Sequence, residues 1–162
     1  MDMRSVGEVK EVVLRGSYCS FRKNVVREKV LCLDLYKGDR FELFKFKVEE
    51  MDRDKVFVFS GKYGIVLGSE YIEYYDKYFD KSEFYGMLVR VKKRFSELIE
   101  RYGKIKVEYY IDDSIVKSWW YVEIIRRCGS ELGFEVEIID VLIDEVIDWE
   151  ELMREKDRFV GF

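Results

Sequence analysis

The sequence predicts a single α/β domain, a Rossmann-like three-layer fold with a mostly parallel sheet. Short β-branched or aromatic segments alternate with longer amphipathic segments, and this order is typical of parallel sheets covered by helices. The chain has 162 residues, enough for one sizeable core. No internal repeat, low-complexity segment or Gly/Ser-rich linker divides it. We therefore expect one domain over residues 1–162.

The first half of the chain is expected to contain two strands and one helix. Residues 9–15 (VKEVVLR) are β-branched and are followed by Gly16, so they are predicted to be the first strand, with residues 17–24 as a loop. Residues 25–36 are ambiguous between a strand and an irregular segment. Residues 39–51 carry regularly spaced apolar residues behind Asp39, a plausible N-cap, and predict a helix. Residues 55–60 (KVFVFS) form an uninterrupted apolar run and predict an interior strand.

The second half alternates helices and strands after a loop over residues 60–76. Residues 82–102 predict a long amphipathic helix with Ser82 as N-cap and Gly103 just past its end. The remaining predictions are strands at residues 105–111 and 134–139, a helix over residues 112–132 closed by Gly133, and a short helix over residues 149–156. Trp119 and Trp120 are expected to place one ring in the core and one near the surface.

Five residue types are missing from the chain: Ala, Pro, Thr, His and Gln. Every codon for these five contains cytosine, whereas the other fifteen amino acids each have a cytosine-free codon and all occur here. A thermophile-like bias toward charged residues lowers Gln and His but does not erase Ala. We therefore expect a sequence engineered or selected to use a restricted alphabet.

The composition also excludes several kinds of chemistry. Without His there is no Ser-His-Asp or Cys-His pair and no His-based zinc motif. Cys19, Cys32 and Cys128 form no C-x-x-C spacing, so no metal site and no cofactor are expected, and Cys32 and Cys128 are predicted to be buried apolar residues. The net charge of −4 argues against nucleic-acid binding by the whole surface. No apolar run is long enough to cross a membrane, and a cytoplasmic protein is expected.

Two loops after predicted strands carry the candidate site. They are SYCSFRKN, at residues 17–24, and SGKYGIVLGSEYIEYYD, at residues 60–76. Ligands of parallel α/β folds bind beyond the carboxyl ends of the strands. Backbone amides near Gly61 and Gly64 are able to approach an anion, with Lys23 and Lys62 as positive charges and Asp76 as an orienting group or base. The alternative is that these glycines form plain turns and the lysines are solvated.

The second loop resembles the signature S-A-K-Y-G-L-L-x-P…I-x-P-Y-D of domain-of-unknown-function family 6884. The matching residues are Ser60, Lys62, Tyr63, Gly64, Ile72, Tyr75 and Asp76. Gly61 and Tyr74 replace the usual Ala and Pro, two types that this chain never uses. GSYCSFRKN is similar to the family's G-C-S-x-x-K at Cys19, Ser20 and Lys23, and LDLYKGDRF to its L-Y-x-S-x-x-F at Leu35, Tyr36 and Phe41. The resemblance covers roughly residues 9–140 and leaves residues 141–162 as an acidic helical tail.

The family pattern is in turn similar to the core domain of archaeosine synthase and, distantly, to a peroxide-stress protein family. This implies a nucleobase or nucleic acid as ligand, and the first hypothesis is an enzyme that acts on a nucleobase, nucleoside or nucleotide. Cys19 or Lys23 is then expected to act as nucleophile or amine, Asp76 as the acid–base group, and Ser60 with the amides of residues 61–64 as an anion or carbonyl binder. Asp76 is expected to matter more than Cys19. Ser20, Tyr36, Tyr63 and Tyr75 complete the expected ligand-binding residues.

Two other functions stay open at this point. One is a module for single-stranded nucleic acid, in which Arg22, Lys23 and Lys62 contact phosphates and Tyr63, Tyr74 and Tyr75 stack on bases. The other is a folded scaffold without activity, whose distinguishing feature is its restricted alphabet. The sequence does not specify a reaction or an oligomeric state.

Overall fold

The computed structural model describes residues 10–20 and 22–160, with side chains up to Glu155. A five-stranded sheet in the order β4-β3-β1-β6-β7 forms its centre. All neighbouring strands run parallel except β3 and β4. The prediction of an α/β fold with a mostly parallel sheet is confirmed. The strands are β1 (Val12–Tyr18), β3 (Val56–Ser60), β4 (Gly64–Leu67), β6 (Ile105–Ile111) and β7 (Glu135–Asp140).

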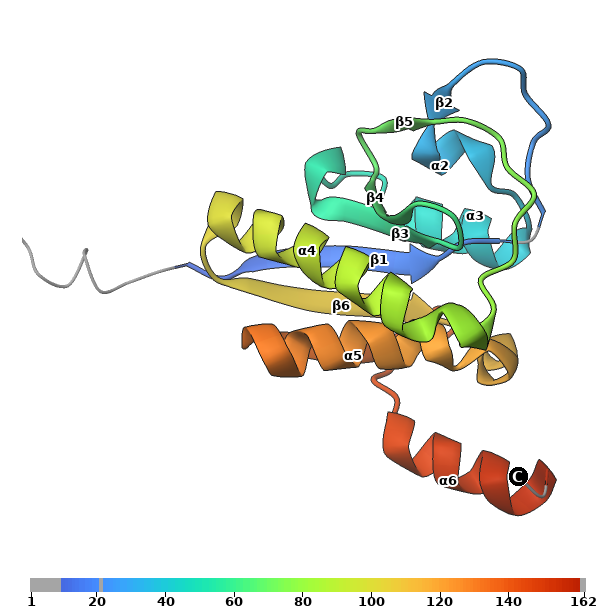
Figure 1. Cartoon of the computed structure of the whole chain (residues 1–162), viewed down its shortest axis with the longest axis vertical. Coiled ribbons are helices and arrows are strands. Elements are labelled where there is room, and N and C mark those ends of the chain that lie inside the picture. Colours follow the sequence, from blue (N-terminus) through green and yellow to red (C-terminus); the bar gives the residue numbers. More distant parts are fainter. Residues whose placement is uncertain (1–9, 21, 161–162) are drawn as a thin grey trace, which may run out of the picture.

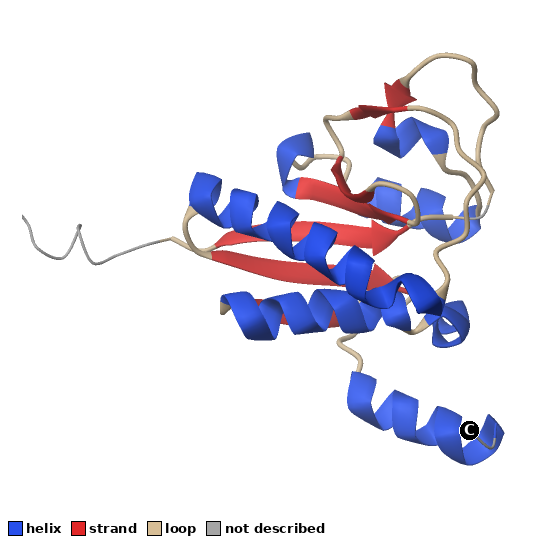
Figure 2. Cartoon of the chain, in the orientation of Figure 1, coloured by secondary structure: helices blue, strands red, loops and turns tan. Residues whose placement is uncertain are grey.

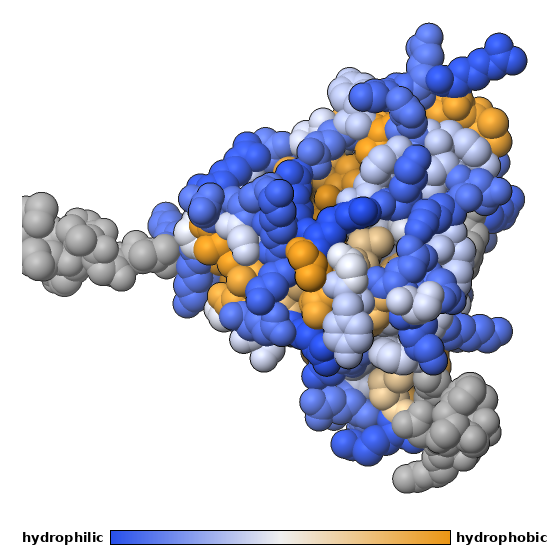
Figure 3. Space-filling model, in the orientation of Figure 1, coloured by the Kyte–Doolittle hydropathy of each residue, from blue (hydrophilic) through white to orange (hydrophobic). Residues whose placement is uncertain are grey.

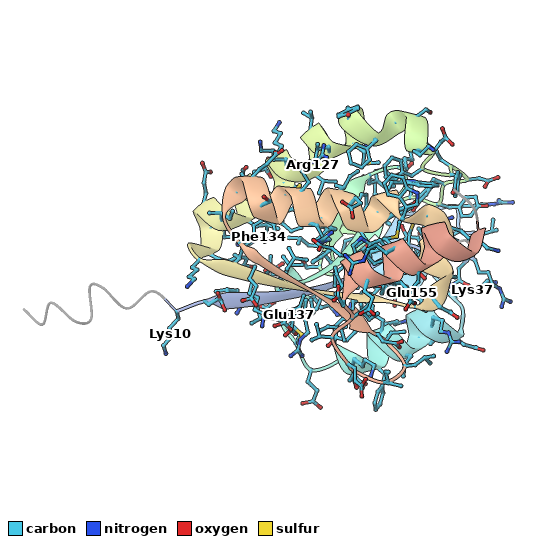
Figure 4. All side chains as sticks on the ribbon, turned by 90° about the horizontal axis from the view of Figure 1, so that it is seen from below. Lys10, Lys37, Arg127, Phe134, Glu137 and Glu155 are labelled. Carbon is cyan, nitrogen blue, oxygen red and sulfur yellow. The ribbon has the colours of Figure 1, made fainter. Side chains whose placement is uncertain are left out.

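Helices flank this sheet, and a two-stranded antiparallel ribbon lies beside it (Figures 1 and 2). The ribbon pairs β2 (Val30–Leu31) with β5 (Tyr71–Ile72). The helices are α2 (Cys32–Leu35), α3 (Asp39–Lys47), α4 (Phe84–Tyr102), α5 (Trp120–Leu132) and α6 (Trp149–Val160). Figure 4 views the molecule from below and shows α4 and α5 on the opposite side of the sheet from α3.

β3 connects the two apolar clusters of the core. Phe57 and Phe59 belong to the cluster that α4 and α5 cover, whereas Val56 and Val58 belong to the cluster that α2 and α3 cover. All four side chains have no exposed surface, because β3 is an interior strand and helices cover both of its faces. The prediction of an interior strand here is confirmed. Each face of β3 therefore needs a large apolar residue, which the VFVF run supplies.

Residues 60–76 are not one loop, and that prediction was wrong. After a tight turn the chain reverses and forms β4, which pairs with β3 and is buried along its whole length. Gly64 begins this strand with φ of 75°, a conformation that favours glycine. Tyr71 and Ile72 then form β5. The GIVL segment was missed because a four-residue buried strand has too little periodicity to distinguish it from a loop.

β1 runs farther than the sequence predicted. It spans Val12–Tyr18, so Gly16 lies inside the strand, whereas the predicted start at Val9 lies outside the described residues. The ring of Phe57 packs directly over Gly16, and a Cβ there would lie 2.2 Å from two of the ring carbons. Gly16 therefore allows a close approach of the neighbouring side chain instead of ending the strand.

Two helix starts also differ from the prediction. The N-cap of α3 is Gly38, so Asp39 is the first helical residue. A short 3₁₀ turn, Lys81–Glu83, precedes α4, and Asp80 caps it together with Glu83 in a capping box. Ser82 was predicted to be this cap, but it is a donor to Asp80 instead. Local sequence does not distinguish between neighbouring polar residues that are each able to cap.

The helix predicted over residues 112–132 has two parts. The chain after β6 first forms a 3₁₀ segment, Asp113–Ser118, and α5 begins at Trp120. Asp112 starts the 3₁₀ segment by accepting the backbone N–H of Ser114. Gly133 closes α5 in the left-handed conformation, as predicted. Asp112 consequently sits at the end of a strand and not inside a helix.

The surface carries both hydrophilic and apolar side chains. Figure 3 shows apolar groups between hydrophilic ones over the face that α4 and α5 form. Tyr85 and Val89 of α4 are among the exposed large side chains. No helix within residues 10–20 and 22–160 is both long and apolar enough to cross a membrane.

The packing at Gly16 generates the first prediction. Gly16→Ala is expected to destabilise the fold by about 3 kcal/mol, the upper end of overpacking costs, because the Phe57 ring is fully buried and has no space to move. Gly86→Ala is the matched control. A Cβ at Gly86 meets nothing within 4 Å, and alanine favours a helix, so a gain of about 0.5–1 kcal/mol is expected. Urea unfolding of both variants measures these changes. Equal stability of the two variants would contradict the packing at β1.

Candidate functional site

The two loops singled out in the sequence meet at one edge of the sheet. β1 and β3 are parallel neighbours, so both carboxyl ends point the same way (Figure 1). The backbone N–H of Cys19, just past β1, donates to the carbonyl of Phe59 at 3.0 Å. This contact places the residue after one strand beside Ser60 at the end of the other.

Three buried hydroxyl groups form a connected chain below this edge. The Ser60 hydroxyl donates to the Tyr75 hydroxyl at 2.9 Å, and the Tyr75 and Tyr36 hydroxyls lie 2.6 Å apart. Their exposed fractions are 0%, 5% and 1% for Ser60, Tyr75 and Tyr36. Burial is the main cause that raises the pKa of both phenols well above the usual value for tyrosine. Both rings therefore stay neutral and act as hydrogen-bonding groups. We call Ser60, Tyr75 and Tyr36 the hydroxyl cluster.

Cys19 and Lys23 adjoin the hydroxyl cluster. The Lys23 ammonium lies 4.7 Å from the centre of the Tyr75 ring, within the range of a cation–π contact. The charge of Cys19 contributes to the raised pKa of Tyr75 and Tyr36. The Cys19 sulfur also lies 3.6 Å from the hydroxyl of Tyr121 on α5. The structure thus brings together Cys19, Lys23 and the hydroxyl cluster.

Tyr121 was not singled out from the sequence. Its hydroxyl faces Cys19, and burial, followed by the charge of Cys19, raises its pKa above the usual value for tyrosine. Tyr121 lies in the apolar stripe of α5, where an aromatic residue normally indicates core packing. No signal in the sequence separates this hydroxyl from an ordinary core ring.

A cleft opens on the other side of Cys19, at the carboxyl ends of β1 and β6. Its volume is about 240 Å³. The strands contribute one wall and the first turn of α3 contributes another. The residues that line the cleft are Ser17, Tyr18, Cys19, Ser20, Arg22, Gly38, Asp39, Arg40, Phe41, Ile111, Asp112, Ser114 and Val141. Of the expected site residues, Cys19 and Ser20 belong to this cleft.

Asp112 is the buried carboxylate of the cleft. Only 8% of the residue is exposed. The Tyr18 hydroxyl donates to its Oδ1 at 2.5 Å, and the backbone N–H of Ser114 donates to the same oxygen at 2.9 Å. Burial, followed by this hydrogen bond to Asp112, raises the pKa of Tyr18 well above the usual value. Tyr18 therefore stays protonated and holds the carboxylate in place.

The sequence indicated that Asp112 is a candidate site residue, but the predicted helix over residues 112–132 included it. Asp112 follows the strand at residues 105–111 directly, and the rule that ligands bind beyond the carboxyl ends of strands applies to it as it does to Cys19 and Ser60. Its assignment to the start of a helix removed it from the candidate residues.

The charges around the cleft balance. Arg22 and Arg40 are positive, and Asp39 and Asp112 are negative. The Arg40 Nε lies 3.9 Å from Oδ2 of Asp112, which is an ion pair but not a hydrogen bond. The cleft therefore offers both donors and acceptors without a net charge on its lining.

Four further residues predicted for the site belong neither to the cleft nor to the hydroxyl cluster. Gly61, Lys62 and Tyr63 line a separate hollow against the start of α4. The Lys62 ammonium lies 5.1 Å from the centre of the Tyr63 ring. Asp76 is exposed and lines neither hollow. The predicted role of Asp76 therefore stays a prediction.

Contacts within the protein account for the conformation of the turn after β3. The backbone N–H groups of Lys62 and Tyr63 donate to the Ser60 hydroxyl at 3.1 and 3.0 Å, so these two amides already have an acceptor. A Cβ at Gly61 would lie 3.0 Å from the Tyr121 hydroxyl. These contacts explain the glycine and the serine without a bound anion. The predicted catalytic and binding roles of these residues stay predictions.

The three cysteines differ in their exposure to solvent. Cys32 and Cys128 are fully buried, as predicted, whereas Cys19 is partly exposed. Residues 10–20 and 22–160 contain no group of three or more Cys, Asp or Glu side chains arranged to hold a metal ion.

No family model, curated protein or solved structure matches this chain.

The hydroxyl cluster generates the second prediction. Tyr75→Phe removes the middle hydroxyl and leaves two buried hydroxyls with one partner fewer, so a loss of about 1–3 kcal/mol in unfolding free energy is expected. Tyr74→Phe is the matched control, because Tyr74 is the adjacent tyrosine and is exposed at 36%. Thermal and urea unfolding measure both. A Tyr75→Phe protein as stable as the Tyr74→Phe protein would show that the cluster does not hold this edge together.

Proposed function

We propose that this chain binds a nucleobase, nucleoside or mononucleotide in the cleft between β1 and β6. The observation that carries the proposal is the position of the cleft. The chain leaves β1 toward α3 on one face of the sheet and leaves β6 toward α5 on the other. Such a point, where the connections diverge at the carboxyl ends of parallel strands, is the usual ligand site of open α/β sheets.

Size and charge support a small, mostly neutral ligand. The cleft volume of 240 Å³ lies just below the range of about 300–1,000 Å³ found for small-molecule sites, so it suits a single nucleoside better than a dinucleotide. Two arginines and two aspartates leave its lining without net charge. A polyanion gains little from such a site, and the chain itself has a charge of −4. These charges disfavour single-stranded nucleic acid as the ligand here.

The resemblance to domain-of-unknown-function family 6884 supports the same ligand class. Its motif residues Cys19, Lys23, Tyr36, Ser60 and Tyr75 come from three separate segments, and they meet at one edge of the sheet. We propose membership of that family, a Rossmann-like three-layer arrangement and a cytoplasmic location on this basis. Cys19 is the proposed reactive group, since it adjoins both the hydroxyl cluster and the cleft.

A restricted-alphabet origin is a separate proposal. It rests on the absence of Ala, Pro, Thr, His and Gln from the chain. A coding strand without cytosine would support it, and cytosine spread through the codons of the other fifteen residue types would contradict it.

The third prediction locates the ligand. Titration of the ¹⁵N-labelled protein with a panel of nucleobases, nucleosides and mononucleotides is expected to shift amide resonances of residues 17–20, 38–41 and 112–114, because these segments surround the cleft. Resonance shifts confined to Lys62 and Arg90, in the hollow beside α4, would show that the ligand binds there and not in the cleft. Absence of any binding across the panel would favour a scaffold without activity.

The fourth prediction concerns Asp76. Because Asp76 is exposed and lies outside the cleft lining, Asp76→Asn is expected to leave the dissociation constant of any panel ligand within about twofold. Calorimetric titration measures the constant, and Glu73→Gln, at an exposed carboxylate in the same segment, serves as the control for charge. A large loss of affinity in Asp76→Asn alone would restore Asp76 as the acid–base group.

A further inference from the structure

The two oxygens of the Asp112 carboxylate have different surroundings. Oδ1 accepts hydrogen bonds from the Tyr18 hydroxyl and from the backbone N–H and hydroxyl of Ser114. Oδ2 has no hydrogen-bond donor among the described residues, and its nearest charged neighbour is the Arg40 Nε at 3.9 Å. The Asp112 side chain is 9% exposed and lines the cleft, and Oδ2 is not one of the fully enclosed polar atoms that lack a partner, so it is accessible from the cleft.

A carboxylate oxygen that lines a cleft and has no protein donor keeps its acceptor positions for a donor from a ligand. Oδ1 is saturated by three donors, so an added donor has to approach Oδ2. Asp112 lines the cleft, and the Arg40 side chain beside it is half exposed. The unfilled acceptor and a movable donor therefore face the same space.

Asp112 Oδ2 and the Arg40 guanidinium together favour a hydroxyl group as their ligand. A hydroxyl donates to Oδ2 and at the same time accepts from the guanidinium of Arg40. An amino group of a nucleobase only donates, and a phosphate only accepts and is repelled by Asp112. A base edge read by two parallel hydrogen bonds needs both carboxylate oxygens, and Oδ1 is already occupied. A sugar hydroxyl matches both groups.

We propose that the cleft takes a ribonucleoside, whose 2′,3′-diol lies between Asp112 Oδ2 and Arg40. The inference rests on the proposed function and deepens it, because it assigns the sugar as the group that is recognised. Tyr18 and Ser114 position Asp112 through Oδ1 and do not touch the ligand. The nucleobase then extends toward Cys19 and Ser20, which also line the cleft.

The test compares ribonucleosides with their 2′,3′-dideoxy counterparts and with the free nucleobases by calorimetric titration. The dideoxy compounds are expected to bind about tenfold or more weakly, because they leave the Asp112 acceptor unpaired. Asp112→Asn is expected to abolish this preference. Asp113→Asn, the same change at the exposed neighbouring residue, is expected to keep it.

A second variant covers the case in which Asp112→Asn does not fold. Arg40→Gln alters a half-exposed side chain and is expected to weaken ribonucleoside binding about three- to tenfold without changing dideoxynucleoside binding. Arg27→Gln, at an exposed arginine outside the cleft lining, is its control. Equal affinity for ribonucleosides and dideoxynucleosides would overturn the sugar assignment while leaving a nucleobase site. Failure of every compound to bind would overturn the proposed function itself.

Discussion

The central constraint in this molecule is that β1 has a parallel neighbour on each side. β3 and β6 both run in its direction, so three carboxyl ends meet at one edge of the sheet. Ser60 ends β3, and Cys19 and Asp112 directly follow β1 and β6, so the three residues lie at the same edge of the sheet although they are far apart in the sequence. Gly16 makes this packing possible, because the ring of Phe57 occupies the space that a side chain at that position would need. The site is thus a consequence of strand direction and of one missing Cβ.

The polar groups at this edge fall into two kinds. In the hydroxyl cluster, Ser60 accepts two backbone amides and donates to Tyr75, which also pairs with Tyr36. These groups satisfy one another away from water, which favours a structural role. In the cleft, one oxygen of Asp112 lacks a donor and faces an opening. An acceptor that faces an opening and has no protein donor is the stronger indication of ligand binding. Cys19 lies between the two groups.

Much of the fold was predictable from the sequence, and the reasons for the failures are physical. The strand at residues 105–111 was predicted with its observed bounds, because its apolar residues and flanking polar residues agree. β4 was missed because its four residues are too few to show a period, and Asp112 because a 3₁₀ segment resembles the first turn of a helix. The meeting of Cys19, Ser60 and Tyr75 was predicted from the shared direction of parallel strands and from the resemblance, which also placed Lys62 and Asp76 there. The outward position of Asp76 depends on the path of the chain after β5, which local patterns do not encode.

The most direct test of the account is a crystal structure of the protein with a ribonucleoside that binds it in solution. We expect density in the cleft at the carboxyl ends of β1 and β6, with a sugar hydroxyl within hydrogen-bonding distance of Asp112 Oδ2 and with the hydroxyl cluster unchanged. Density in the hollow beside α4, or a ligand that contacts Asp76 and leaves Asp112 without a partner, would contradict it.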